Sequence, residues 1–154
     1  MSYKIISNKD LNKLKKIKRP FVLLPMAADI IHYGHTRIIK KASNLGNVIV
    51  GLMTDKSILS YKKSTSFFSY RYRKEILNSF KYIKLIIPLK GLVYDEITEL
   101  IKPDYFVHGS DWNKPPQLYA KNKLKKTIKI KRLNCKIRTF EYTKKISSTI
   151  IKNQ

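Results

Sequence analysis

Short apolar runs alternate along the chain with segments whose apolar residues recur every three or four positions. Residues 21–26 and 47–53 are nearly continuous apolar runs, and each has the length of a buried strand rather than of a helix. Between them, residues 36–45 place apolar side chains on one face, which is typical of a helix that packs on a sheet. The pattern therefore predicts a strand, a helix and a second strand.

The same alternation continues towards the C-terminus. It predicts three further helices, at residues 71–80, 94–102 and 118–127. It also predicts three further strands, at residues 84–88, 105–108 and 136–140. Strands that alternate with helices in this way form parallel sheets covered by helices. We therefore predict an α/β fold, and we expect functional residues just after the strands, because ligands of such sheets bind there.

The length and composition fit one domain without covalent cross-links. A chain of 154 residues typically buries about two thirds of the surface that its unfolded form exposes, and the single Cys135 cannot form an internal disulfide. We expect residues 1–19 to form a basic leader and residues 20–154 to form the domain. No apolar run approaches the roughly 20 residues that span a bilayer, and no secretory signal is visible, so we expect a cytoplasmic protein.

The chain is strongly basic, with 33 Lys and Arg against 10 Asp and Glu and a formal net charge of +23. Such a charge favours binding to nucleic acid or to an anionic membrane when the cations form a patch. Here the cations are spread along the sequence, and the densest stretch is residues 121–136. We therefore expect the charge to steer a small polyanionic substrate, and a non-catalytic nucleic-acid-binding protein is the alternative.

Two histidines follow the first predicted strand and open the first predicted helix. His32 and His35 are three positions apart, so they lie on the same side of the first turn, and Gly34 lets a ligand approach the backbone closely. Free amides and the positive end of a helix dipole favour an anion there, and imidazoles add donors or positive charge. The pattern indicates a phosphate site; the alternatives are a helix cap beside a surface histidine, and a zinc site completed by Asp29.

Polar residues also follow two later strands. The segment His108-Gly109-Ser110-Asp111-Trp112 comes after the fourth predicted strand. Beyond the last strand, Ser147, Ser148 and Thr149 have the composition of a cap and first turn of a terminal helix. The second cluster is a further candidate site for an anion, with an ordinary helix cap as the alternative.

Three of these segments together resemble a known family. In this order and at these separations, His32-Tyr33-Gly34-His35, Gly109-Ser110-Asp111-Trp112 and Ile146-Ser147-Ser148-Thr149 are similar to the motifs of the cytidylyltransferases, over residues 21–151. Within that family the chain most resembles the phosphonate cytidylyltransferases, which couple CTP to 2-aminoethylphosphonate. That closer similarity is carried by residues 28–32, 51–56, 60–62, 70–74 and 102–109.

The resemblance implies a Rossmann-like parallel sheet flanked by helices, and it implies roles for individual residues. His32 and His35 would hold the CTP phosphates and stabilise the pentacoordinate α-phosphorus, and Lys62 would contact phosphate or the incoming phosphonate. The residues implied in nucleotide binding are Gly34, Gly109, Asp111, Trp112, Thr143, Ser147, Ser148 and Thr149. The last three would grip the β- and γ-phosphates, and backbone groups near Thr143 would read the cytosine.

Acceptor binding is implied for two further residues. Asp29 would face the acceptor, and Arg73 would orient it or brace the loop that carries Lys62. The alternative for Arg73 is a helix-surface ion pair with Glu75 or Asp55. His108 is equally well explained as a packed strand-end residue or as a ligand-binding residue.

The resemblance also implies partners. Mg²⁺ would be held chiefly by substrate phosphates and water, since few carboxylates are available to bind it directly, and two copies of the chain would pair as a homodimer. The favoured acceptor is 2-aminoethylphosphonate, with phosphocholine, phosphoethanolamine and glycerol 3-phosphate left open. An adenylyl-transferring relative, which shares His-x-Gly-His but not Gly-x-Asp-Trp, is a different enzymatic alternative.

Several positions depart from the family pattern. Tyr142 stands where the glycerol-phosphate members carry Arg, which favours the phosphonate branch, and Lys145 stands where phosphonate-type relatives have Gly. Ser110 replaces an acidic residue, and the Gln and Asp of the phosphonate template are missing near Leu89 and Val93. The missing Asp leaves room for a different acceptor.

Overall fold

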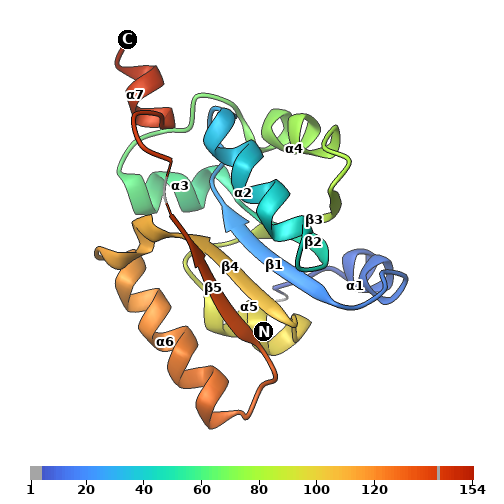
Figure 1. The fold of residues 1–154 in the computed structure, drawn as a ribbon. Helices are drawn as coiled ribbons and strands as arrows, with labels where there is room; N and C mark the ends of the chain where they lie inside the picture. Colours follow the sequence, from blue (N-terminus) through green and yellow to red (C-terminus); the bar gives the residue numbers. More distant parts are fainter. Residues whose placement is uncertain (1–4, 142) are drawn as a thin grey trace.

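The computed structural model describes residues 5–141 and 143–154, and its centre is a five-stranded sheet (Figure 1). The strands are β1 (Phe21–Met26), β2 (Asn47–Met53), β3 (Ile83–Leu89), β4 (Tyr105–Gly109) and β5 (Lys136–Phe140). All five strands predicted from the sequence are present, with ends that differ by at most one residue. Tyr142, on which the comparison with the glycerol-phosphate members depends, lies outside the described residues.

The sheet order is β3-β2-β1-β4-β5, and every neighbouring pair is parallel. Both halves of the chain therefore start from the centre of the sheet and extend outwards in opposite directions. All five carboxyl ends lie at one edge, and the order reverses between β1 and β4. A crevice at that reversal is where sheets of this kind bind ligands. The Rossmann-like α/β fold expected from the sequence is confirmed.

Helices cover both faces of the sheet. They are α1 (Asn8–Lys15), α2 (Tyr33–Ser43), α3 (Asp55–Lys62), α4 (Tyr70–Asn78), α5 (Tyr94–Ile101), the 3₁₀ helix η1 (Ser110–Asn113), α6 (Gln117–Ile130) and α7 (Ser148–Lys152). On one face, α1, α3, α5 and α6 pack over a cluster that contains Leu23, Ile49 and Phe106. On the other face, α2 and α4 pack over Val22 and Val50. Alternate residues of the central strands thus enter opposite halves of the core.

Two α-helices, as well as the short 3₁₀ helix η1, were not predicted from the sequence. The helix α1 lies within the basic leader, and Leu14 and the preceding Ile6 are buried against the domain. The helix α3 begins after Thr54, whose hydroxyl accepts from the Ser57 amide at 3.2 Å. Lys62 is therefore the last residue of a helix, and the loop expected there is not found. Both helices were missed because each offers few apolar positions among its 8 residues.

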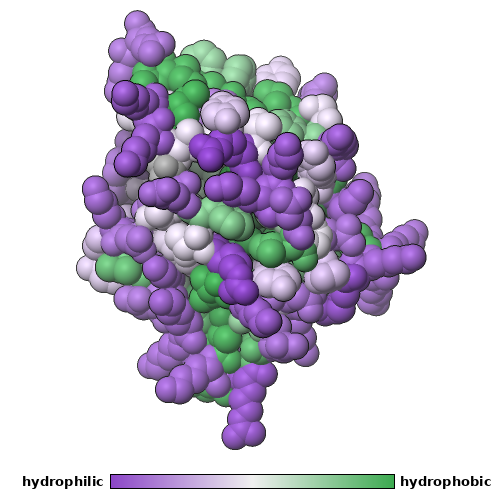
Figure 2. Space-filling view, in the orientation of Figure 1, coloured by the Kyte–Doolittle hydropathy of each residue, from purple (hydrophilic) through white to green (hydrophobic). Residues whose placement is uncertain are grey.

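Hydrophilic side chains are spread over the face seen in Figure 2, rather than gathered over one element. This distribution agrees with the spread of cations along the sequence. Among the described residues, no helix combines the length and the apolar character needed to cross a membrane.

Candidate active site

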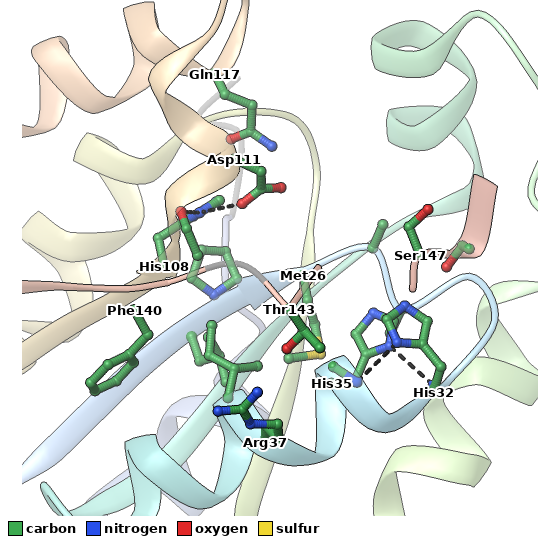
Figure 3. A pocket seen from close by; sticks show the side chains of 18 of the residues that line it. Met26, His32, His35, Arg37, His108, Asp111, Gln117, Phe140, Thr143 and Ser147 are labelled. Atoms are coloured by element: carbon green, nitrogen blue, oxygen red, sulfur yellow. Dashed lines mark hydrogen bonds and ion pairs between the residues drawn. The ribbon is translucent and has the colours of Figure 1, made fainter. Parts of the chain in front are cut away.

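A pocket lies at the carboxyl edge of the sheet, where the strand order reverses, and residues of all three motifs line it (Figure 3). Ten of the residues singled out from the sequence are among its lining: His32, Gly34, His35, Lys62, Gly109, Asp111, Thr143, Ser147, Ser148 and Thr149. His35 and Ser147 are far apart in the sequence but share this one hollow. Asp29, Arg73 and Trp112 are absent from the lining.

The two motif histidines bind each other's backbone. His32 is the N-cap of α2, and its Nδ1 accepts from the Gly34 amide at 3.0 Å. His35 Nδ1 accepts from the His32 amide at 3.2 Å. Because a backbone amide can only donate, neither Nδ1 carries a proton, so each neutral ring carries its proton on Nε2. The expectation of free amides at this helix end is wrong for Gly34 and His32, and the donors offered by the pair are imidazole Nε2–H groups.

The same environment keeps both rings neutral. Burial lowers the pKa of His35 to about 3, and the nearby His32 and Lys62 act in the same direction. Burial also lowers the pKa of His32. The pair therefore acts as two directional hydrogen-bond donors rather than as two positive charges. Such donors stabilise negative charge that builds up in a transition state.

Gly34 is required by the packing of the His32 ring. A Cβ atom at position 34 would lie 2.8 Å from His32 Cε1 and 3.1 Å from His32 Nδ1. It would also lie 3.5 Å from Thr143 Cβ, which places the start of α2 beside the segment after β5. The absence of a Cβ atom at position 34 thus leaves space for the His32 ring, while Thr143 would be in ordinary van der Waals contact.

The third motif is bonded directly to the first. Ser147 is the N-cap of α7 and accepts from the Ile150 amide at 3.1 Å, as the sequence predicted for a cap. The Ser148 hydroxyl accepts from the Ile30 amide at 3.3 Å and donates to the Ile30 carbonyl at 3.2 Å. Ser148 therefore fastens α7 to the loop before His32, whereas Ser147 keeps its own hydroxyl proton available.

Asp29 faces the interior and not the pocket. Its Oδ1 accepts from the Phe67 amide at 2.6 Å and from the Phe68 amide at 3.3 Å, and its Oδ2 pairs with Lys152 of α7. The carboxylate is 1% exposed. Asp29 therefore joins three segments, and the acceptor contact expected for it has no support in this geometry.

Arg73 is a brace between strand ends. Its fully buried guanidinium donates to the carbonyls of Ala27 and Met53, both at 2.7 Å, and pairs with Asp55 at 2.7 Å. A further bond goes to the Phe68 carbonyl at 3.0 Å. The structure thus shows two things expected for Arg73, a bracing role and the ion pair with Asp55. The arginine lies in the core, however, and not on the helix surface.

Trp112 packs behind His108, a residue of the pocket wall. It is fully buried, its ring stacks on His108 with centroids 4.5 Å apart and planes at 3°, and its Nε1 donates to Thr139 at 3.2 Å. His108 is also buried, yet it lines the pocket. Trp112 therefore positions a pocket wall instead of forming one.

The comparisons with known proteins agree with this geometry. The family model described as Cytidylyltransferase-like matches residues 27–154. The chain belongs to the cytidylyltransferase-like family.

Two relatives of this cytidylyltransferase-like chain are named glycerol-3-phosphate cytidylyltransferase. The Staphylococcus aureus protein is 33% identical over 85 residues, which cover 54% of this chain and 64% of that protein. The Bacillus spizizenii protein is 40% identical over 87 residues, covering 54% and 66%. The matches thus span slightly less than two thirds of the length of these relatives. The bifunctional protein HldE of Campylobacter jejuni RM1221 is 31% identical over 118 residues, covering 71% of this chain and 24% of that protein.

Solved structures share the fold. A lipopolysaccharide core biosynthesis protein from Thermoplasma volcanium superposes with a TM-score of 0.63 at 19% identity, covering 80% of this chain and 97% of that one. The pantoate-beta-alanine ligase of Francisella tularensis gives a TM-score of 0.60 at 16% identity, covering 91% and 66%. At these identities the likeness concerns the fold alone.

The charged groups of the cytidylyltransferase-like pocket affect one another. Burial lowers the pKa of Lys62, and Lys152 acts in the same direction, whereas the Asp29 and Asp111 carboxylates oppose it. Burial by itself would raise the pKa of Asp111, but the hydrogen bond and charge of His108 outweigh it, so that pKa lies below its ordinary value. The pocket therefore holds the Asp111 carboxylate near the Lys62 ammonium group, and the carboxylates around Lys62 offset only part of the effect of burial on its pKa.

The described residues contain no group of three or more His, Cys, Asp or Glu side chains arranged to hold a metal ion. In particular, Asp29 is paired with Lys152, so it does not complete a zinc site with the two motif histidines. Asp111 and Glu141 are the carboxylates that line the pocket.

Sequence reasoning assigned no role to six polar residues of the lining, which are Arg37, Lys41, Tyr61, Tyr94, Gln117 and Glu141. The first two belong to α2, the next three to α3, α5 and α6, and Glu141 follows β5. Tyr61 lies within residues 60–62, which carry part of the resemblance. Only Tyr61 carried a signal in the sequence, because it adjoins Lys62.

Proposed function

We propose that this chain transfers CMP from CTP to a small phosphonate or phosphate acceptor and releases pyrophosphate. The observation that carries the proposal is the convergence of His32, His35 and Ser147 on one pocket that Lys62 also lines. The pocket thus presents neutral donors, hydroxyls and a cation, which are groups suited to a triphosphate and a second anion.

The chemistry needs little from the protein beyond positioning and charge stabilisation. An acceptor oxyanion attacks the α-phosphorus, a new P–O bond forms, and the bond to the bridging oxygen breaks as pyrophosphate leaves. The acceptor is already deprotonated, so no general base is required. His32 and His35 would donate from Nε2 to the α-phosphate oxygens, and Lys62 would hold the acceptor in line.

The nucleotide would be held at the end of the pocket that the third motif covers. Ser147 and Thr149 would bind the β- and γ-phosphates, and Ser148 would hold α7 in place through Ile30. Backbone groups near Thr143 would read the cytosine.

The oxygen ligands that the pocket offers suit a magnesium ion that binds together with the triphosphate. Mg²⁺ prefers oxygen ligands and keeps several waters, and the described pocket offers Asp111 as a charged carboxylate beside Gly109. Asp111 would be its protein contact. When bound, the ion would neutralise charge on the leaving pyrophosphate.

We propose 2-aminoethylphosphonate as the acceptor, with glycerol 3-phosphate as the second candidate. The first rests on the sequence motifs that resemble the phosphonate cytidylyltransferases. The second is favoured by the relatives named glycerol-3-phosphate cytidylyltransferase. Both acceptors present the same oxyanion to Lys62.

A homodimer that pairs through the first-motif region is part of the proposal. Tyr33 lies beside His32 and is 62% exposed, so it is available for such a contact. Light scattering that gives the mass of two chains would support this arrangement, and the mass of one chain would contradict it.

The test is a pyrophosphate-release assay with CTP or ATP against a panel of acceptors. We expect release with CTP and one phosphonate or phosphate acceptor. Release with ATP alone would indicate an adenylyl-transferring enzyme, and no release together with nucleic-acid binding would indicate a binding protein.

Two variants of one residue separate catalysis from helix capping. His32→Ala removes both functions, whereas His32→Asn keeps an oxygen that can accept from the Gly34 amide. If the Nε2–H acts on the α-phosphate, both variants should lose at least about a hundredfold in kcat. Retained turnover in His32→Asn would contradict the proposed role.

A further inference from the structure

A chain of hydrogen bonds runs along the wall of the pocket and ends at Tyr61. The Tyr94 hydroxyl donates to Gln117 Oε1 at 2.6 Å, and Gln117 Nε2 donates to the Tyr61 hydroxyl at 3.3 Å. At the other end, Tyr94 contacts His108 Nε2 at 3.2 Å. These residues come from α3, α5, α6 and β4, so the wall joins four elements.

The wall is rigid because its polar atoms are buried and paired. Tyr94 is fully buried, and Gln117 and His108 are each 6% exposed. His108 is further held by its stacking on Trp112. Polar groups buried in this way keep their partners, because leaving one unpaired is costly. The amide of Gln117 is thereby oriented with its nitrogen towards Tyr61.

The direction of the bonds leaves Tyr61 as a donor. Tyr61 accepts from Gln117 Nε2, so its own hydroxyl proton is not needed for that bond and can be donated to a group in the pocket. Lys62 follows it directly at the end of α3, and both residues line the pocket. A hydroxyl donor beside an ammonium group is suited to the oxygens of a phosphate or phosphonate.

This wall lies away from the nucleotide end of the pocket. Figure 3 shows Gln117 and Asp111 on one side, well separated from Phe140 and Arg37 on the other. The motif residues His35 and Ser147 lie in a third region. The side bounded by Gln117 thus lies apart from His35 and Ser147 and adjoins Asp111, the proposed magnesium contact, so it is the side where the second substrate would lie.

We propose that Tyr61 binds the phosphoryl or phosphonyl oxygens of the acceptor together with Lys62, and that Gln117 positions the Tyr61 hydroxyl for this contact. The inference rests on the proposed function and adds to it a binding residue and a positioning residue. The contact concerns the oxyanion group that all candidate acceptors share, so it does not depend on which acceptor is the natural one.

The test compares the Michaelis constant for the acceptor with that for CTP, measured on the whole chain of 154 residues. Tyr61→Phe removes only the hydroxyl, and we expect the acceptor KM to rise roughly 10- to 100-fold, as the loss of a hydrogen bond to a charged group does. The KM for CTP should be unchanged. Tyr119→Phe is the matched control, because Tyr119 is 67% exposed and does not line the pocket.

Gln117→Glu tests the positioning role. A carboxylate has nearly the same shape but can only accept, so it would draw the Tyr61 proton towards itself and away from the acceptor. We expect the same rise in acceptor KM as in Tyr61→Phe, with little added effect in the double variant. A merely structural Gln117 would alter stability but not the ratio of the two KM values.

The possible failures can be told apart. If the wild-type chain releases no pyrophosphate with any acceptor, the proposed function fails and this inference fails with it. If the wild type is active and Tyr61→Phe has an unchanged acceptor KM, only the role of Tyr61 is overturned.

Discussion

Lys152 in the C-terminal helix α7 forms an ion pair with Asp29, which lies just before the first motif. The Asp29 side chain is completely buried, and its second oxygen accepts from the Phe67 and Phe68 amides. Since α7 begins with the hydroxyl cluster of the third motif, this pair sets where that cluster lies relative to His32.

Asp29→Asn should release α7 while keeping an acceptor for the Phe67 amide. Removing one partner of a buried pair typically costs about 3–5 kcal/mol, so we expect a large loss in the free energy of unfolding, measured by urea titration, and a higher KM for CTP. Lys152→Met should destabilise the protein at least as much, because it leaves the fully buried Asp29 carboxylate without its cation, whereas Lys152 is 26% exposed. If Asp29 instead bound the acceptor, its substitution would raise the acceptor KM without loss of stability.

Arg73→Lys should destabilise the protein although it preserves the charge. A single ammonium group cannot reach the Ala27, Met53 and Phe68 carbonyls together with Asp55. We expect a loss of several kcal/mol, as for other disrupted buried charge networks, in chemical denaturation. Arg71→Lys, on the exposed side of the same helix, is the control and should change little.

Gly34→Ala should impair turnover without preventing folding. The added Cβ would lie 2.8 Å from His32 Cε1, so the imidazole must move away from its position over the helix end. We expect a loss in kcat of at least about tenfold, because misplacing a transition-state donor is costly. In Gly51→Ala the new Cβ would meet nothing closer than 3.7 Å. Equal effects of the two substitutions would exclude this explanation.

Acidification should destabilise the protein through the histidine pair. The pKa of His35 is lowered from 6.5 to about 3 in the folded state, so the unfolded chain binds more protons between these values. The free energy of unfolding should therefore fall as the pH drops from about 6.5 towards 4, by at most about 1.4 kcal/mol per pH unit for this group. His35→Asn should give a shallower decline in denaturant titrations at several pH values. Parallel curves for both proteins would contradict the assignment.

Lys145→Gly should stabilise the turn before the third motif. Lys145 has a φ of 62°, in the left-handed region that costs a side-chain-bearing residue about 1–2 kcal/mol. Glycine avoids that cost but gains freedom in the unfolded chain, so we expect a net gain of about 0.5–1 kcal/mol by thermal or urea unfolding. Lys144→Gly, at an exposed neighbour without a positive φ, should destabilise instead.

Local patterns were sufficient for most of the architecture. The strands β1 and β2 are nearly continuous apolar runs, and the terminal helix begins at a serine whose cap bond is local. The helix α1 was not predicted because most of its residues are basic or polar. Its packing depends on Leu14, which contacts a core built from residues much later in the chain. No local pattern in the sequence specifies the order of the strands in the sheet either.

The sequence alone determined the fold class and the three motifs, because periodicity and spacing are properties of neighbouring residues. Only the tertiary structure decided which side chains reach the pocket. Asp29, Arg73 and Trp112 turn inwards, where distant carbonyls, amides and rings satisfy them, whereas Tyr61 and Gln117 lie in the pocket wall. The direction of a polar side chain depends on the partners that packing brings to it, and those partners lie far away in the sequence.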